Sequence, residues 1–160
     1  MSEATRENIL NRLLEIGKTV TGIEDAFRNR GFLKTDKRPC IVVLDGDETP
    51  RLSLDTRRLR GRVGFMAPQI VQMRPELYII PEEVRVTGVN ESDVNVGTTI
   101  NDIRSRYLQA IWTDAPLAAF VGSNGNMVYN GMSTDLKSGS TLSGQMRLDF
   151  IINYALIPTA

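Results

Sequence analysis

The chain has 160 residues, of which 41% are hydrophobic and 24% charged, a composition typical of one ordinary globular domain. Lysine plus arginine and aspartate plus glutamate both number 19, so the formal net charge of +0 gives no overall attraction to nucleic acid or anionic membranes. Histidine is absent and Cys40 is the only cysteine. This excludes a Ser-His-Asp triad and an intrachain disulfide and argues against a structural zinc site.

The first residues, MSEATREN, are polar and do not resemble a signal peptide. No run approaches the ~18 apolar residues of a membrane span, so no membrane association is predicted. A single cysteine fits a reducing compartment. We therefore expect synthesis in the cytoplasm, and no cofactor is predicted.

Residues 3–16 have the apolar spacing of an amphipathic helix, with Ser2 as its cap and Gly17 followed by Lys18 as its end. Residues 19–28 predict a short strand, with a helix as the alternative, and 29–38 predict a loop.

Pro39 precedes a continuous apolar run, Cys40 to Leu44, which is rich in β-branched residues. Such a run predicts a strand covered on both faces, with Cys40 as a small core residue rather than a nucleophile. The dipeptide Asp45-Gly46 predicts a turn that ends the strand.

Residues 49–64 are rich in arginine and predict an exposed loop or hairpin tip. Strand character returns at 70–73 and 77–80. Pro75 lies between these two runs and predicts an edge strand or a bulge, because proline cannot donate to a ladder. Residues 82–97 predict another polar loop.

A second helix is predicted from about Thr98 to Asp114. Core packing is the default for Tyr107 and Trp112, although a tryptophan at a helix end can also anchor a subunit contact. A short extra turn follows at 117–121, then a strand at 127–129 and a Gly/Ser/Thr-rich loop at 130–143. The last strand, 145–156, alternates with period two and has the clearest pattern of the chain.

This order predicts an α+β fold, a mixed and mostly antiparallel β-sheet flanked by two α-helices. Residues 1–160 form a single domain in this interpretation, with long polar loops near 49–64, 82–97 and 130–143.

Three groups of residues are considered as possible binding sites for a metal ion or phosphate. A divalent cation prefers carboxylate oxygens as ligands, and these could come from Asp45, Asp47 and Glu48. Asp-Gly after a strand is ordinary turn chemistry, however, so a turn is favoured over a metal site. Arginines at 57–62 could contact phosphate, although a solvated loop or one docking on a partner subunit is favoured. The glycine-rich stretches 122–125 and 139–141 match no phosphate-binding motif. No catalytic residue and no metal ligand is predicted.

Several phrases nonetheless resemble a known group of proteins. They are FRNRG followed by KRPCIVVLDGDE, then MRPELYIIPEE, INDIRSRYLQAIWTD and VGSNGNMVYNGMSTDL before a long alternating strand. In their order they resemble the tail terminator and tail-completion proteins of long-tailed, siphovirus-type bacteriophages. The similarity covers nearly the whole chain and includes no catalytic signature.

The resemblance implies a structural virion protein at the head-proximal end of the tail, assembled in the host cytoplasm. Such proteins form a ring, typically a hexamer, which stops polymerisation of the tail tube protein and presents a surface to neck or head-completion proteins. DNA would only pass through as cargo. The implied fold is a mixed, mostly antiparallel sheet flanked by helices.

A ring requires contacts between copies of the chain, and charged clusters are the candidates for them. Opposite charges at 57–62 and 45–48 could pair across subunits. The candidate interface residues are Arg28, Arg30, Asp45, Asp47, Glu48, Arg57, Arg58, Arg60 and Arg62.

Three alternatives remain open. A neck or head-completion protein shares small α/β subunits and rings, and binding to capsid portals would identify it. A small enzyme would require an apolar pocket with convergent ionisable groups. A nucleic-acid binder would use the arginine loop and show salt-sensitive binding.

Overall fold

The computed structural model describes residues 2–30, 39–53, 69–81, 84–85, 91–123, 125–137 and 141–156. Its elements are α1 (Ser2–Thr19), β1 (Asp25–Arg28), β2 (Cys40–Ser53), β3 (Gln69–Ile80), β4 (Val84–Arg85), α2 (Glu91–Trp112), α3 (Ala115–Val121), β5 (Asn126–Lys137) and β6 (Thr141–Leu156). The single α+β domain predicted from the sequence is confirmed. Within the described ranges, one short helix, α3, is added to the two expected.

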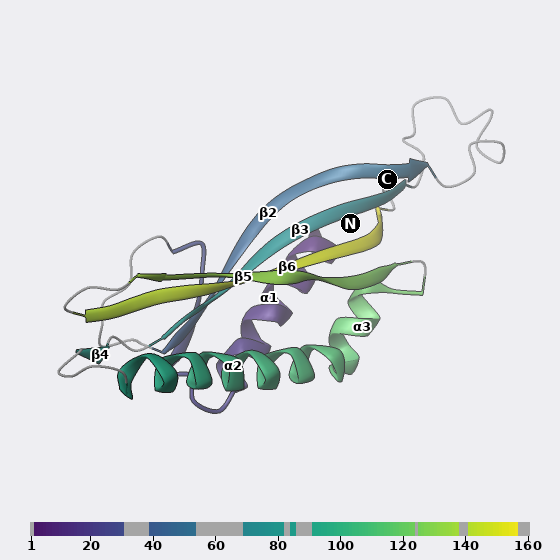
Figure 1. Cartoon of the computed structure of the whole chain (residues 1–160). Helices are drawn as coiled ribbons and strands as arrows, with labels where there is room; N and C mark the ends of the chain where they lie inside the picture. Colours follow the sequence, from purple (N-terminus) through teal and green to yellow (C-terminus); the bar gives the residue numbers. More distant parts are fainter. Residues whose placement is uncertain are drawn as a thin grey trace, which may run out of the picture.

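The strands form one mixed sheet in the order β1-β2-β3-β6-β4, and β5 pairs with the other side of β6 (Figure 1). Strand β1 runs parallel to β2, and every other described pairing is antiparallel. The long strands β3 and β6 are therefore central, and β5 forms an edge. All described helices lie against the same face of the sheet, which we call the inner face; the opposite one is the outer face.

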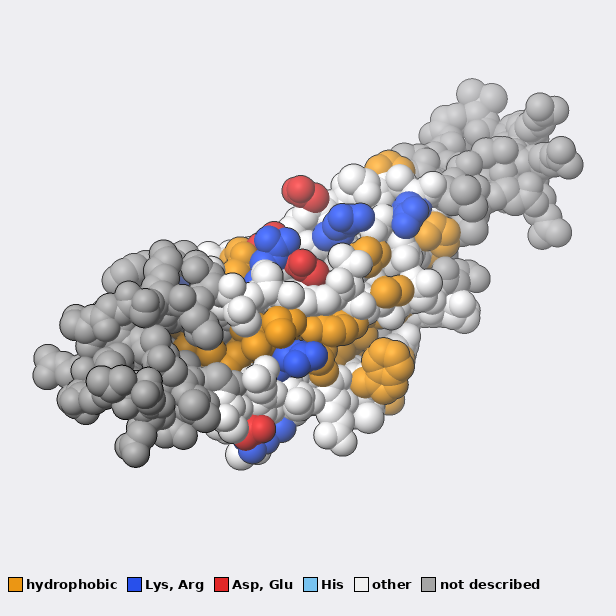
Figure 2. Space-filling view, viewed as in Figure 1, with side chains coloured by type: hydrophobic (Ala, Val, Ile, Leu, Met, Phe, Trp, Pro, Cys, Tyr) orange, Lys and Arg blue, Asp and Glu red, His pale blue; other side chains and the backbone are white. Residues whose placement is uncertain are grey.

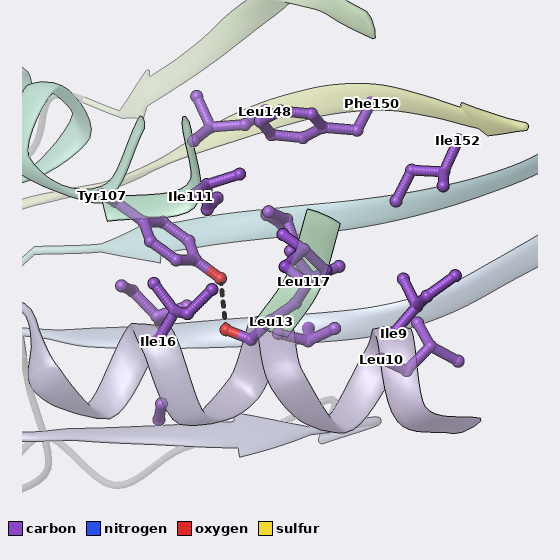
Figure 3. Packing of buried hydrophobic residues seen from close by; sticks show 14 of the residues in the cluster. Ile9, Leu10, Leu13, Ile16, Tyr107, Ile111, Leu117, Leu148, Phe150 and Ile152 are labelled. Atoms are coloured by element: carbon purple, nitrogen blue, oxygen red, sulfur yellow. Dashed lines mark hydrogen bonds between the residues drawn. The ribbon is translucent and has the colours of Figure 1, made fainter. Parts of the chain in front are cut away.

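The core lies between the helices and the inner face, where α1, α2 and α3 meet the alternating apolar residues of β2, β3 and β6 (Figure 3). The alternation predicted for β6 is confirmed, because Leu148, Phe150 and Ile152 belong to this cluster. The expected double coverage of β2 is confirmed as well. Ile41 and Val43 belong to the helix-side core, while Cys40 and Val42 form a second buried cluster on the outer face.

The predicted turn at Asp45-Gly46 is wrong, because β2 continues to Ser53 and these two residues form a bulge. The ladder shifts register between Leu44 and Asp47, so that the bulge lies opposite Pro75. Proline has no N–H for the ladder at this point, which makes an extra residue on the neighbouring strand compatible with pairing. The bulge predicted from Pro75 is confirmed, but the edge strand is not, since β3 is central.

A second bulge lies in β5 between Tyr129 and Gly131, on the other side of β6. Its neighbour on β6, Asp149, pairs with Glu76 of β3, one residue from Pro75. The two bulges and the proline thus lie in one row across four strands. Bulges increase the local twist of a sheet, and β2 and β3 curve away from the helices along their length in Figure 1.

The predicted end of the first helix at Gly17 is also wrong, since α1 continues to Thr19. A Cβ atom at Gly17 would lie 3.3 Å from Cγ2 of Ile41, so the glycine allows α1 to approach β2 closely. Only Asp25–Arg28 of the predicted strand 19–28 is extended. The second helix begins at Glu91, well before the expected Thr98.

The three predicted polar loops are replaced in part by regular structure among the described residues. Strand β2 extends into 49–64, β4 and the start of α2 occupy part of 82–97, and β5 and β6 cover most of 130–143. Polar strand residues were mistaken for loop residues, because both strands of the β5–β6 hairpin carry few apolar side chains at this end. The remainder of 49–64 lies outside the described residues, as does most of the predicted loop 29–38.

The expected extra turn at 117–121 is confirmed as α3, which Asp114 caps by accepting a hydrogen bond from the N–H of Leu117. Arg12 of α1 donates two hydrogen bonds to the same carboxylate, at 2.9 and 2.6 Å. These bonds lower the pKa of Asp114 below its ordinary value. A single aspartate therefore fixes the start of α3 and its position against α1.

Candidate interaction surface

Two of the predicted interface residues, Arg28 and Asp45, contact each other within the chain. The guanidinium of Arg28 donates from Nε and Nη2 to the two carboxylate oxygens of Asp45, each at 2.7 Å, and also to Glu7 of α1. Asn29 accepts a hydrogen bond from the Asp45 N–H. We call this group, completed by Arg6, the bulge clamp, because Arg6 donates to the carbonyl of Gly46 at 3.0 Å.

The bulge clamp fixes the β2 bulge to the amino-terminal half of α1. The forked, charge-assisted contact with Arg28 lowers the pKa of Asp45, and hydrogen bonding to the same guanidinium lowers the pKa of Glu7. Both carboxylates are thus engaged inside the subunit. Their described contacts support a role in holding the fold.

The other predicted residues have separate environments. Glu48 accepts hydrogen bonds from Arg6 and from the hydroxyl of Tyr154. The guanidinium of Arg30 lies 4.7 Å from the ring centroid of Phe27, and Asp47 is exposed. Arg57, Arg58, Arg60 and Arg62 lie outside the described residues, so their pairing with the acidic group stays a prediction.

Arg28→Met should lower stability by about 1–2 kcal/mol at neutral pH, because the partly buried carboxylate of Asp45 loses two charge-assisted hydrogen bonds. A carboxylate with a lowered pKa stabilises the fold above its unfolded pKa, and this contribution disappears as the pH falls through the folded value. The difference between wild type and variant should therefore shrink below about pH 4. Urea unfolding from pH 7 to pH 3 measures it.

Lys18→Met is the matched control for this variant. It removes a cation that pairs with Glu15 at 3.1 Å in an exposed pair of α1. Such pairs contribute little, so its stability should follow wild type at every pH. A pH-independent loss in Arg28→Met would mean that side-chain packing, rather than the ion pairs, stabilises this region.

A cavity of about 360 Å³ opens on the outer face beside the row of bulges. Three charged residues of its lining contact one another: Arg147 donates to Asp149 at 2.7 Å and lies 3.3 Å from Glu76. Glu76 in turn accepts a hydrogen bond from the hydroxyl of Tyr78. No cluster of metal-ligating side chains occurs among the residues described.

Exposed apolar side chains gather elsewhere, around α2, α3 and β5. Trp112 is 78% exposed, and Phe120, Val128 and Met132 are between 37% and 45% exposed. The core prediction is confirmed for Tyr107, which is fully buried, and is wrong for Trp112. Figure 2 shows hydrophobic side chains in a strip between β5 and α2 and again over α3. Large exposed apolar side chains in one region indicate contact with a partner.

A groove of about 240 Å³ lies at one end of this region, between the α2–α3 corner and the start of β5. Trp112 and Met127 line it, together with the inward side chains of α3. Trp112 is held at the rim by the helix corner, where α2 ends and Asp114 begins the next helix. The groove is therefore formed by rigid elements.

Two buried polar atoms in the strip have no hydrogen-bond partner among the described residues. The guanidinium of Arg104 on α2 lies 6.0 Å from the ring centroid of Tyr129 on β5. Among described partners, neither Nε of Arg104 nor the hydroxyl of Tyr129 forms a hydrogen bond, although both atoms are buried. Buried polar atoms normally form hydrogen bonds, so these two atoms have hydrogen-bonding capacity that the described residues do not use.

The edge of β5 completes this region. β5 pairs along one side with β6, and no described strand pairs with its other side. Residues 126–134 of this edge carry no charge. We call the free edge of β5 with Arg104, Trp112, Tyr129 and Met132 the edge surface.

Sequence reasoning missed most of the edge surface. The stretch 130–143 was expected to be a loop, so the edge strand was predicted to be much shorter than β5 is. The one available signal was Trp112 at a predicted helix end, where an aromatic residue can anchor a subunit contact.

No protein-family profile matches the chain, and no curated protein matches it either. None of the helices in the described part of the chain is long and apolar enough to span a membrane.

Proposed function

We propose that this chain is a structural virion protein that forms a ring at the head-proximal end of a phage tail tube. The ring, a hexamer in this proposal, ends tube polymerisation and joins the tail to neck or head-completion proteins, and DNA passes through it as cargo. The support from sequence is the resemblance described above. The observation that carries the proposal is the edge surface, with Trp112 78% exposed beside a preformed groove.

The chemistry of the described residues favours assembly over catalysis. The carboxylates of the bulge clamp have arginine partners within the chain, and so do Glu76 and Asp149 in the outer-face cavity. By contrast, the edge surface exposes apolar groups and unpaired backbone, which are stabilised when a protein partner covers them.

Purified protein should form rings with a central hole, alone or on isolated tail tubes. Mass determination in solution combined with negative-stain microscopy measures this. When the purified protein is added to polymerising tube protein, the tubes should stop growing and carry a ring at one end. A chain that stays monomeric and leaves tube growth unchanged would contradict the proposal, and binding to capsid portals instead of tubes would favour a neck or head-completion protein.

Trp112→Ala should weaken ring formation by about tenfold or more, because an exposed tryptophan beside a groove is typical of an interface hot spot. The fold should be unchanged, since the indole is mostly exposed. Analytical ultracentrifugation across a concentration series gives the association constant, and circular dichroism checks the fold. Thr113→Ala is the neighbouring control, since this exposed side chain bonds only back to the Gln109 carbonyl among described groups.

A further inference from the structure

We infer that the free edge of β5 is the site at which a second copy of this chain docks, by adding backbone to the sheet and covering the groove beside it. This inference rests on the proposed function for the nature of the partner. Its structural argument is independent and concerns the edge, the apolar groups beside it and the area that they expose.

The edge is long, and most of it carries no charge. β5 has 12 residues, which span about 40 Å, and no described strand pairs with its outer side. Natural edge strands are usually shielded by lysine, proline or charge; residues 126–134 contain none of these, and the charged residues Asp135 and Lys137 lie only at the far end. The bulge at Tyr129–Gly131 divides the edge into two stretches. This makes it a specific acceptor and a poor template for open-ended aggregation.

The bulge also places apolar groups on both sides of the edge. Val128 pairs with Ile151 and lies on the outer face, whereas Met132 pairs with the core residue Leu148 and lies on the inner face. Without the extra residue, side chains four apart would share one face. An added backbone would therefore meet an exposed apolar side chain both above and below the sheet.

The exposed area requires a folded partner. An added strand about 40 Å long on a sheet about 10 Å thick covers on the order of 400 Å², half of the ~800 Å² per partner typical of stable interfaces. About half of the remainder is supplied if the same partner also covers the groove at Trp112, because this aromatic side chain can bury about 150–250 Å². An isolated extended peptide along the edge would leave this tryptophan exposed.

The proposed ring makes a second copy the partner, and charge does not oppose this contact. Residues 126–134 give no electrostatic selection for an acidic or basic peptide, and two chains of net charge +0 do not repel each other. The opposite end of the sheet is β1, so the two ends of each subunit are unlike. A contact from β5 to a different surface of the next copy repeats around an axis and closes into a ring.

Val128→Lys and Met132→Lys, made separately, should each reduce ring formation at least about tenfold, because a lysine on an edge strand opposes strand addition. Both positions are about half exposed, so the monomer should remain folded by circular dichroism. Gln109→Lys, on the exposed side of α2 opposite its buried face, is the control for the added charge and should assemble normally. Rings formed equally by all three variants would overturn the inference and leave the proposed function intact.

A photo-crosslinker at position 128 identifies the occupant directly. An adduct with the mass of two copies of this chain supports the inference, and mass spectrometry of the adduct locates the contacted segment. An adduct with tube or neck protein alone would overturn it. If the protein gives a dimeric adduct but forms no ring and does not cap tubes, the edge contact is supported and the proposed function is contradicted. Failure of the inference and failure of the proposed function are therefore distinguishable.

Discussion

Gly46→Ala should lower the free energy of unfolding by about 3–5 kcal/mol, among the largest losses expected for a single methyl group. The added Cβ would lie 1.9 Å from the carbonyl oxygen of Arg74 and 2.7 Å from its carbonyl carbon. Both atoms belong to the backbone of β3, so no side-chain rotation can relieve the contact. Gly46 also has φ of 66°, which disfavours alanine. Strands β2 and β3 would have to separate at the row of bulges.

Gly131→Ala separates the two causes. This glycine of the second bulge has φ of 120°, but a Cβ added there meets nothing within 4 Å. The variant should therefore lose only the cost of an unfavourable backbone conformation, about 1–3 kcal/mol. Urea unfolding of both variants at one protein concentration gives the comparison. Equal losses would show that φ alone matters and that the close approach of β2 to Arg74 does not.

Tyr107→Ala should cost about 3–5 kcal/mol, because the ring fills the space between α1, α2 and the sheet and is completely buried. In Figure 3 its hydroxyl points from α2 to α1, where it donates a hydrogen bond of 2.8 Å to the carbonyl of Leu13. Burial also raises the pKa of this phenol above its ordinary value. Removal of the side chain takes away both the packing and the polar link between the two helices.

Tyr107→Phe keeps the ring and removes only the hydroxyl, so it should cost about 1 kcal/mol. Thermal and chemical unfolding of the two variants side by side measure packing and hydrogen bonding separately. A phenylalanine variant as unstable as the alanine variant would mean that the link to Leu13, rather than the buried ring, holds the two helices together.

Local patterns in the sequence were sufficient for elements whose signal lies within their own residues. The alternation in β6 and the apolar run at Cys40 predicted strands correctly, because each pattern follows from which faces are buried. Asp45-Gly46 was misread because the same dipeptide suits a turn or a bulge. The partner that decides between them, Pro75, is about thirty residues away in the chain and becomes a neighbour only through pairing.

Local sequence patterns could not predict the edge surface, for a similar reason. β5 is polar and contains glycine and asparagine, features that favour a loop, and only its ladder with β6 makes it a strand. The exposure of Trp112 depends on the corner between α2 and α3, which directs the indole away from the core that Tyr107 enters. The ion pairs of the bulge clamp likewise join residues from three elements that no short motif connects.

The position of β6 has a consequence for synthesis. β6 is the last described element in chain order, yet it pairs with β3, β4 and β5. While the ribosome is still making residues 141–156, β3 lacks one neighbour and β5 has no described partner at all. The free edge of β5 therefore exists only after β6 has been translated and folded. In the proposed ring, a chain that lacks β6 would also lack this contact.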